Sequence, residues 1–373
     1  MVTDKKSSSK KNKSFIRNLL SRMKNWWSKN IFHKIITILL LAIMFWVLSL
    51  TVVAQWYIDK HKHEPLVFGA TFIQDYVEYY GLNPKDTMSA IINDLGIKHL
   101  RLVSYWKDIE STPGTYDFSQ LDWQFKEANK TGTKVSLAIG LRQPRWPECQ
   151  EPKWVDSMTE EQWYPRLKDF MKQVIDRYKN NPALESYQLE NEYFMKAFGE
   201  CTNFDRNRLV DEFNFVKSLD PSHPLIISRS NNWIGIPMGQ PRPDMFAISV
   251  YKRVWDKTVT HRYFEYPLPA RFYAMLAGWG EILTGKNMMI HELQAESWLP
   301  PNYEMLTAPL SEQDKSMNPQ RLKDRIEYGK ATGMKRIDLW GVEWWYWHKV
   351  KLNDNSLWQT AKEEIANSQG ATN

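Results

Sequence analysis

The sequence has few residues of the kinds that hold metal ions, and this scarcity argues against several classes of site. Only two of its 373 residues are cysteine, Cys149 and Cys201, and neither lies in a spacing typical of a metal site. The eight histidines form no H-x-x-x-H pair. We therefore expect no metal centre and no cofactor, and a metal-dependent hydrolase is not favoured.

Residues 61–373 carry no excess of positive charge. The formal net charge is +6, but residues 1–60 contain eleven Lys and Arg against two Asp, so residues 61–373 carry about −3. The main part of the chain has no basic footprint typical of nucleic-acid binding, and we expect no nucleic-acid partner. We find no internal repeat and no second domain, which indicates one large domain with an N-terminal appendage.

One long run without charged residues, Ile35 to Ala54, is present near the N-terminus. Its twenty residues are enough to cross a bilayer as a helix. Ten basic residues precede it, so the positive-inside rule places the N-terminus in the cytoplasm. Aromatic residues typical of the membrane interface flank the run on both sides: Trp26, Trp27, Trp56 and Tyr57.

These features predict a single-pass protein of the cell membrane. Residues 1–34 would form a basic cytoplasmic arm, residues 35–57 a transmembrane anchor, and residues 65–368 a domain outside the cytoplasm. A cleaved signal peptide is the alternative, because Val52-Val53-Ala54 resembles a small-residue cleavage site. The apolar run is longer than the usual 7–15 residues of a signal peptide, so we favour an uncleaved anchor.

From residue 65 onward, short apolar runs alternate with helical patterns, which is typical of a parallel sheet with crossover helices. Eight runs are predicted strands: residues 66–72, 97–103, 134–140, 184–193, 224–228, 245–251, 288–293 and 336–341. Eight strands, mostly separated by helices, predict an α/β fold of the (β/α)₈ or TIM-barrel type. The weak point is residues 230–244, whose Gly and Pro content does not favour a helix.

Two predicted strands end in a glutamate. The fourth ends in the pair Asn191–Glu192, and the seventh in Glu292. On a strand, Glu190 and Glu192 would point to the same face. Either glutamate alone is most simply a solvated charge, but a barrel brings the C-terminal ends of its strands together at the active-site rim. Two carboxylates on opposite sides of one bond are the arrangement used in glycoside hydrolysis.

The chain resembles the clan A glycoside hydrolases, retaining (β/α)₈ enzymes that include many cellulases, mannanases and β-galactosidases. The resemblance spans roughly residues 65–350 and rests first on the Asn-Glu pair after strand four and the Glu after strand seven. It implies that Glu192 is the acid/base and Glu292 the nucleophile. The sequence departs from the pattern at Ser249, where many members have His, and at His291, where Thr is frequent.

The same resemblance implies further site residues. Arg101 in HLRLV and Tyr251 in ISVY correspond to residues close to the nucleophile, and Trp340 in LWGVEWW corresponds to the aromatic residue that ends strand eight. Opposite charge on Arg101 would keep Glu292 ionised, although a purely structural buried pair is an equal alternative for this arginine. The amide of Asn191 is suited to hydrogen-bonding a substrate hydroxyl.

Tryptophan is unusually frequent after the predicted strands. Sugar rings stack on indole, so this pattern is typical of a polysaccharide cleft, although part of the set is expected to be core. We expect Trp146 and Trp298 to contact substrate. The nine tryptophans concerned are Trp106, Trp146, Trp154, Trp233, Trp255, Trp298, Trp344, Trp345 and Trp347.

Three more glutamates lie near the same rim. Glu190 is expected in a polar inward layer, Glu296 on a substrate-contacting loop, and Glu343 in the turn after strand eight. Glu296 also competes with Glu292 for the role of nucleophile. We favour Glu292, because it shares strand parity with Met288 and Ile290 and stands where strand gives way to loop.

The two cysteines fall in the loops after strands three and four. Neighbouring strands place these loops side by side, so we predict a Cys149–Cys201 disulfide, as suits an oxidising compartment.

The sequence thus favours a membrane-anchored, extracytoplasmic retaining β-glycoside hydrolase that acts on an oligo- or polysaccharide by a two-carboxylate double displacement. A carbohydrate-binding pseudoenzyme and a cell-surface transglycosylase in the same barrel remain open alternatives.

Overall fold

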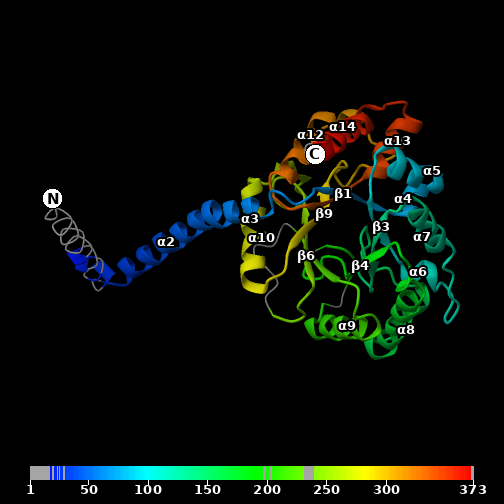
Figure 1. Cartoon of the computed structure of the whole chain (residues 1–373), viewed down its shortest axis with the longest axis horizontal. Helices are drawn as coiled ribbons and strands as arrows, with labels where there is room; N and C mark the ends of the chain where they lie inside the picture. The colour runs from blue at the N-terminus through cyan, green and yellow to red at the C-terminus, as the bar shows by residue number, and fades with distance from the viewer. Residues whose placement is uncertain are drawn as a thin grey trace.

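The computed structural model describes most of the chain as one long helix joined to a barrel (Figure 1). The helix consists of α2 (Ile31–Leu48), the π-helical turn η1 (Ser49–Val53) and α3 (Ala54–His61). Its 31 residues make it long and apolar enough to cross a membrane, and the predicted anchor at 35–57 lies within it. The described residues are 17, 18, 21, 22, 24, 26, 27, 30–195, 198–201, 204–230 and 239–370.

Eight parallel strands close into a barrel in the order β1-β10-β9-β6-β5-β4-β3-β2. This confirms the predicted (β/α)₈ fold, and each predicted strand has its counterpart. The strands are β1 (Val67–Phe72), β2 (His99–Val103), β3 (Lys134–Ile139), β4 (Leu184–Leu189), β5 (Leu225–Arg229), β6 (Met245–Val250), β9 (Met288–Gln294) and β10 (Arg336–Trp340).

Helices surround the strands on all sides in Figure 1, and their apolar faces bury the outer surface of the barrel. They are α4 (Gln74–Tyr79), α5 (Pro84–Ser89), η2 (Ala90–Asp94), α6 (Trp106–Ile109), α7 (Ser119–Thr131), η3 (Lys153–Val155), α8 (Glu160–Tyr178), α9 (Arg206–Leu219), α10 (Ala270–Thr284), α11 (Leu310–Gln313), α12 (Pro319–Lys330), α13 (Val342–Lys351) and α14 (Ser356–Gly370). The uncertain connection at 230–244 lies largely outside the described residues, which omit 231–238.

The helix ends follow local signals in the sequence. The Asn83 side chain accepts hydrogen bonds from the backbone N–H groups of Lys85 and Asp86, and Pro84 occupies the first turn of α5. Gly132 closes α7 with φ +68°, a conformation that glycine adopts without strain. Signals of this kind explain why the helix positions could be read from the sequence.

A β-bulge in β9 changes which side chains point into the barrel. Ile248 pairs with Ile290, but the next residue of β6, Ser249, pairs with Glu292, so β9 holds one extra residue here. The strict alternation on which the parity argument for Glu292 relied therefore does not hold. Glu292 also lies within β9, which extends to Gln294, and not at its end.

The lower part of the barrel interior contains a buried polar contact. His99 Nδ1 lies 3.0 Å from Asp338 Oδ1, and both side chains are almost fully buried. Gly69 on β1 stands beside this pair, where an added Cβ would lie 2.0 Å from Asp338 Oδ1 and 2.7 Å from His99 Nδ1. Glycine is therefore required at this position for steric reasons.

We predict that Gly69→Ala lowers the free energy of unfolding by more than the 1–3 kcal/mol that is usual for about one methyl group of overpacking. The new Cβ overlaps buried atoms of two strands that cannot move apart without opening the barrel. Gly96→Ala is the matched control, since Gly96 has φ +75° but no heavy atom within 4 Å of its Cβ position. Its expected cost is about 1–2 kcal/mol of backbone strain. Equal losses in chemical denaturation would contradict the packing argument.

Candidate active site

A cavity of about 970 Å³ opens at the C-terminal ends of the barrel strands. Both predicted catalytic residues, Glu192 and Glu292, line it. Four more of the predicted site residues also form its walls: Tyr251, Trp146, Trp298 and Trp340. The fold therefore brings together, at one rim, residues that lie up to about two hundred positions apart in the sequence.

Both carboxylate oxygens of Glu292 accept strong hydrogen bonds. Arg101 Nη1 donates to Oε1 and the Tyr251 hydroxyl donates to Oε2, each at 2.7 Å. The carboxylate is almost fully buried, so these two donors replace the hydrogen bonds that water would otherwise make to it.

Arg101 on β2 connects three strands of the barrel mouth. Besides Glu292, its guanidinium donates to Gln188 Oε1 at 2.5 Å and to Asn191 Oδ1 at 2.8 Å. Arg101 thus contacts the candidate nucleophile and is not merely part of a structural pair elsewhere in the barrel. The amide of Asn191 contacts Arg101 and Glu148, and its hydrogen bond to a substrate hydroxyl stays a prediction.

Glu192 follows β4 at the point where the chain leaves the barrel. Its φ is +43°, and its backbone N–H donates to Ser228 Oγ at 2.9 Å. The strand ends at Leu189 and Glu190 also has a positive φ, so the expected common strand face of Glu190 and Glu192 is wrong. The turn, and not strand alternation, directs Glu192 into the cavity.

The surroundings of Glu192 favour its protonated form. Burial raises the pKa of Glu192 to about 8, with further contributions from the charges of Glu292 and Glu148. Its Oε1 atom is buried without a hydrogen-bond partner among the described residues. The two carboxyl groups therefore have different surroundings: both oxygens of Glu292 accept hydrogen bonds, whereas burial is the largest influence on Glu192.

Ser249 and His291 stand where the sequence departs from the pattern of clan A. Ser249 is fully buried, and together with Arg142 it opposes the rise in the pKa of Glu192. His291 occupies the bulge of β9. Burial and the nearby charge of Arg101 hold the pKa of His291 well below its ordinary value, so this ring is neutral.

Glu148 is a cavity residue that the sequence did not reveal. It lies in the loop after β3, where its Oε2 accepts a hydrogen bond from Asn191 Nδ2 at 2.9 Å. Burial raises the pKa of Glu148 to about 7, although Arg142 at 3.6 Å opposes the shift. The one available signal was its place beside Cys149, which fixes this loop to the next one.

Glu296 forms the centre of a cluster with Arg145 and Trp340 on the cavity wall. Arg145 Nη1 donates to its Oε1 at 2.7 Å, and the Trp340 indole N–H donates to the same oxygen at 3.0 Å. The guanidinium of Arg145 also stacks 3.4 Å from the ring centre of Tyr76 and 4.4 Å from that of Trp340. Glu296 lines the cavity, as expected of a substrate-contacting residue, but its carboxylate already holds Arg145 and Trp340 in place.

An aromatic wall runs along one side of the cavity. Trp146 contacts Phe198 with ring centres 5.7 Å apart, Phe198 lies 6.3 Å from Trp298, and Trp298 lies 5.5 Å from Tyr251. Trp146 is the most open of them, with 53% of its surface exposed. Such a surface can stack on the C–H faces of sugar rings. Phe198 was not predicted, because a single aromatic residue in a long loop carries no recognisable pattern.

Several other tryptophans expected at the rim are core residues instead. Trp106 is buried on α6, and Trp344, Trp345 and Trp347 are buried on α13, a helix that directly follows β10. Trp154 is half-buried and donates to the carbonyl of Glu110 at 2.9 Å. Trp233 lies outside the described residues.

Trp255 does line the cavity, but on an element that was not predicted. The strands β7 (Arg253–Trp255) and β8 (Tyr263–Glu265) form an antiparallel hairpin after β6. This hairpin places Val254, Phe264 and Trp255 on the cavity wall. Strands of three residues are too short to show an alternating pattern in the sequence.

The carboxylates of Glu190 and Glu343 bond to other groups of the protein and do not line the cavity. Glu190 accepts backbone hydrogen bonds from Leu141 and Arg142 at 2.8 and 2.9 Å and pairs with Arg208 of α9. It therefore fixes the loop after β3 to α9, which differs from the expected place in an inward polar layer. Glu343, in the first turn of α13, accepts from the backbone N–H of Ile73 at 2.9 Å.

The predicted disulfide is present. Cys149 and Cys201 are bonded with their Cα atoms 5.4 Å apart, and they join the loops after β3 and β4. These loops carry Glu148 and Phe198, so the disulfide restrains two parts of the cavity wall. Among the described residues, no group of three or more His, Cys, Asp and Glu is arranged to hold a metal ion.

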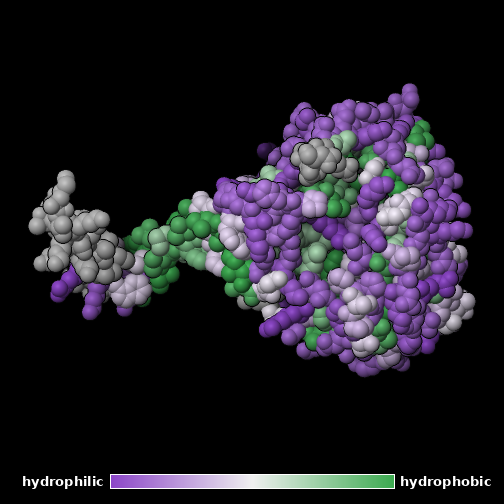
Figure 2. Space-filling model, viewed as in Figure 1, coloured by the Kyte–Doolittle hydropathy of each residue, from purple (hydrophilic) through white to green (hydrophobic). Residues whose placement is uncertain are grey.

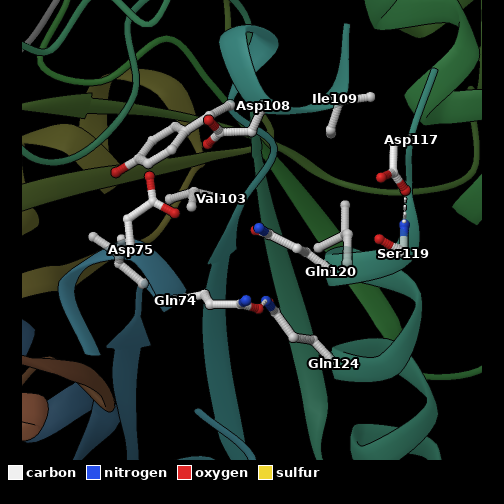
Figure 3. Close-up of a pocket in the computed structure, with 12 residues that line it drawn as sticks. Gln74, Asp75, Val103, Asp108, Ile109, Asp117, Ser119, Gln120 and Gln124 are labelled. Carbon is white, nitrogen blue, oxygen red and sulfur yellow. Dashed lines mark hydrogen bonds between the residues drawn. The ribbon is translucent and has the colours of Figure 1, made fainter. Parts of the chain in front are cut away.

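A second and much smaller pocket of about 80 Å³ lies between the loops after β1 and β2 (Figure 3). Asp75 and Asp108 point into it from one side and Gln120 from the other. Burial and the charge of Asp75 raise the pKa of Asp108 to about 6. The pocket shares a wall with the main cavity through Ile73 and Tyr105, which pack with Trp340.

We predict that Glu192→Gln makes the protein more stable at about pH 9 than the wild type. The pKa of Glu192 is about 8 in the folded chain against the ordinary 4.5, so the folded state binds the proton more tightly and the wild type loses this stability as pH rises from about 4.5 to 8. Glutamine cannot ionise, so the gain in melting temperature should shrink as pH falls toward about 5. The surface variant Glu363→Gln is the control. A constant difference at all pH values would contradict the burial argument.

The comparisons with known proteins agree with this architecture. No protein-family model matches the chain, and no curated protein matches it. Among solved structures, a variant of a GH5_18 protein from Bifidobacterium longum subsp. longum, in complex with Manβ1-4GlcNAc, has a TM-score of 0.57 at 11% identity, covering 82% of this chain and 79% of that one.

Two further solved structures have similar scores. An exo-β-1,4-mannosidase from Opitutaceae bacterium strain TAV5 has a TM-score of 0.55 at 11% identity, covering 82% of this chain and 60% of that chain. A β-galactosidase from Halorubrum lacusprofundi has a TM-score of 0.54 at 12% identity, covering 82% of this chain and 58% of that chain. The chain thus spans less than two thirds of these two proteins. At such low identities the likeness concerns the fold, and the chain has the (β/α)₈ barrel of these proteins.

Proposed function

We propose that the chain is a retaining β-glycoside hydrolase in which Glu292 is the nucleophile and Glu192 the acid/base. The observation that carries the proposal is the opposite environment of the two carboxyl groups. Arg101 and Tyr251 donate hydrogen bonds to both carboxylate oxygens of Glu292, whereas burial raises the pKa of Glu192 to about 8. Pairs of carboxyl groups whose surroundings separate their pKa values are typical of acid/base assignments in glycosidases.

In the first step, a carboxylate oxygen of Glu292 attacks the anomeric carbon of the bound sugar. The bond to the glycosidic oxygen breaks, and Glu192 gives its proton to that oxygen, which leaves as an alcohol. Arg101 and Tyr251 hold the attacking carboxylate in orientation. The product of this step is a glycosyl ester on Glu292 and an ionised Glu192.

In the second step, the ionised Glu192 takes a proton from a water molecule. The water oxygen attacks the anomeric carbon, the ester bond to Glu292 breaks, and both carboxyl groups return to their starting states. Loss of negative charge from Glu292 in the ester lowers the pKa of Glu192, because that charge is one cause of its rise. The same group can therefore act as acid first and as base afterwards.

The cavity suggests an oligo- or polysaccharide as substrate. Its size exceeds what a single monosaccharide fills, and the wall from Trp146 through Phe198 to Trp298 offers successive stacking surfaces. The fold likeness to a mannosidase and a β-galactosidase supports a carbohydrate substrate as well. Transfer to a sugar acceptor would use the same two glutamates, so analysis of the products separates a transglycosylase from a hydrolase.

Three variants test the assignment. Glu292→Gln removes the nucleophile and should abolish turnover of aryl β-glycosides. Glu192→Gln should lower turnover by about 10²–10⁴-fold for substrates with poor leaving groups. With an activated leaving group, for which the second step limits turnover, added azide should restore turnover of Glu192→Gln, since azide attacks the glycosyl ester without a base. Glu296→Gln should mainly raise KM, because it releases Arg145 and Trp340.

A fluorinated glycosyl donor, followed by peptide mapping, identifies the nucleophile directly. The label is expected on Glu292, and a label on Glu296 would overturn the assignment. An inverted anomeric product would overturn the retaining mechanism. Binding of oligosaccharide with no turnover of any glycoside would instead favour the carbohydrate-binding pseudoenzyme.

We further propose that the helix from Ile31 to His61 is an uncleaved membrane anchor with the barrel outside the cytoplasm. The suggested cleavage point at Ala54 lies inside this helix and is fully buried against the barrel. Cleavage there would require the helix to open and would remove Val53 from its contact with Gly278. The basic residues before Ile35 support a cytoplasmic N-terminus.

Protease added to intact cells should therefore digest the barrel and leave the basic arm protected. The digestion should need conditions that loosen the barrel, since one pair of its loops is joined by the disulfide. A C-terminal epitope tag should disappear while an N-terminal tag remains. A mature secreted protein that begins near Gln55 would show a signal peptide instead.

A further inference from the structure

The apolar helix is packed against the barrel and is not a free tether. Ala54 and Tyr57 are fully buried, and the Tyr57 hydroxyl donates to Asn287 Oδ1 at 2.7 Å. Gly278 on α10 allows close approach, since an added Cβ there would lie 2.8 Å from Val53 Cγ1. The direction of the helix relative to the barrel is therefore fixed by tight packing.

Charged groups strengthen the same junction. Lys60 Nζ and His61 Nε2 contact the two carboxylate oxygens of Glu281 at 2.5 and 2.8 Å. Glu281 thereby joins α10 to α3.

Helix α10 carries an exposed apolar patch next to this junction, formed by Trp279, Ile282 and Leu283. Ile282 and Leu283 are 49% and 55% exposed, and the spacing of the three residues places them on one helix face. The Trp279 ring lies 5.6 Å from that of Phe45 on α2. The patch is thus continuous with the apolar surface of α2, which runs up to the barrel in Figure 2.

The length of the membrane span determines the depth of this patch. About twenty helical residues cross the hydrocarbon core, so a span that starts at Ile31 ends near Leu50, and one that starts at Ile35 ends near Ala54. Phe45 then lies five to nine residues inside the outer boundary, which is about 8–14 Å along the helix. Trp279 contacts Phe45, so the patch on α10 reaches below the membrane surface.

Basic residues lie on α3 and at both ends of α10. Lys60 lies beside Trp56, with its Nζ 5.0 Å from the ring centre, and Arg271 in the first turn of α10 donates to Gln55. Lys286 follows the end of α10. Tryptophan and basic side chains around an apolar helix face are typical of helices that lie in the membrane interface.

We propose that the barrel is seated on the outer leaflet through the patch of Trp279, Ile282 and Leu283, with α10 lying in the interface. The proposal rests on the membrane anchor proposed above. In Figure 1 the helices encircle the strands, and α2 extends outward from the side of the barrel next to α10. In this seating the cavity at the strand ends would open along the membrane surface, which suits a glycan that lies close to the lipid headgroups.

Fluorescent labels on single introduced cysteines in the full-length protein test this seating in phosphatidylcholine vesicles. Leu283→Cys reports on the patch and Leu41→Cys on the span. Val350→Cys, with 50% of its side chain exposed on α13, is the matched control away from the junction. The Leu283 and Leu41 labels should be quenched by lipids with brominated acyl chains. Quenching by aqueous iodide should be several-fold weaker at both than at Val350.

The outcomes separate the two proposals. If the Leu41 label is quenched by brominated lipid but the Leu283 label is as open to iodide as the Val350 label, the anchor stands and the seating on the leaflet is wrong. If the Leu41 label is not quenched by brominated lipid, the anchor itself is wrong and the seating falls with it.

Discussion

The candidate site depends on the burial of one positive charge, that of Arg101, in the mouth of the barrel. A buried guanidinium is costly unless each of its donors has a partner. Glu292 supplies the opposite charge, and the amide oxygens of Gln188 and Asn191 accept the remaining bonds. Because these partners belong to different strands, the same contacts that neutralise Arg101 also fix the position of the candidate nucleophile.

The other carboxyl groups of the cavity differ in their charge partners and in their pKa values. The guanidinium of Arg101 is bonded to Glu292, and burial raises the pKa of Glu192 and of Glu148, although Arg142 lies 3.6 Å from Glu148. Glu296 lies on the opposite wall, where Arg145 supplies its charge partner. The carboxyl groups that line the cavity thus differ in their hydrogen-bond donors and charge partners, and double displacement needs one carboxyl group as nucleophile and another as acid/base.

Much of the fold could be predicted from the sequence, because its signals are local. Apolar runs, helix caps such as Asn83 and terminators such as Gly132 identified the eight strands and most of the helices. Helix α13 was not predicted, because its tryptophans were interpreted as aromatic residues of the cavity rim. In the structure they are buried in the core. The hairpin of β7 and β8 was not predicted either, because strands of three residues are too short to show an alternating pattern.

The sequence by itself determined the barrel, the apolar helix, the disulfide pair and the identity of Glu192 and Glu292 as the leading candidates. It could not determine how these carboxyl groups are aimed, because the bulge at His291 and the positive φ of Glu192 break the alternation on which parity depends. It also could not show Glu148 in the cavity or Trp279 against Phe45. Those contacts join residues far apart in the chain, and only the closed barrel and its packing against the N-terminal helix bring them within reach.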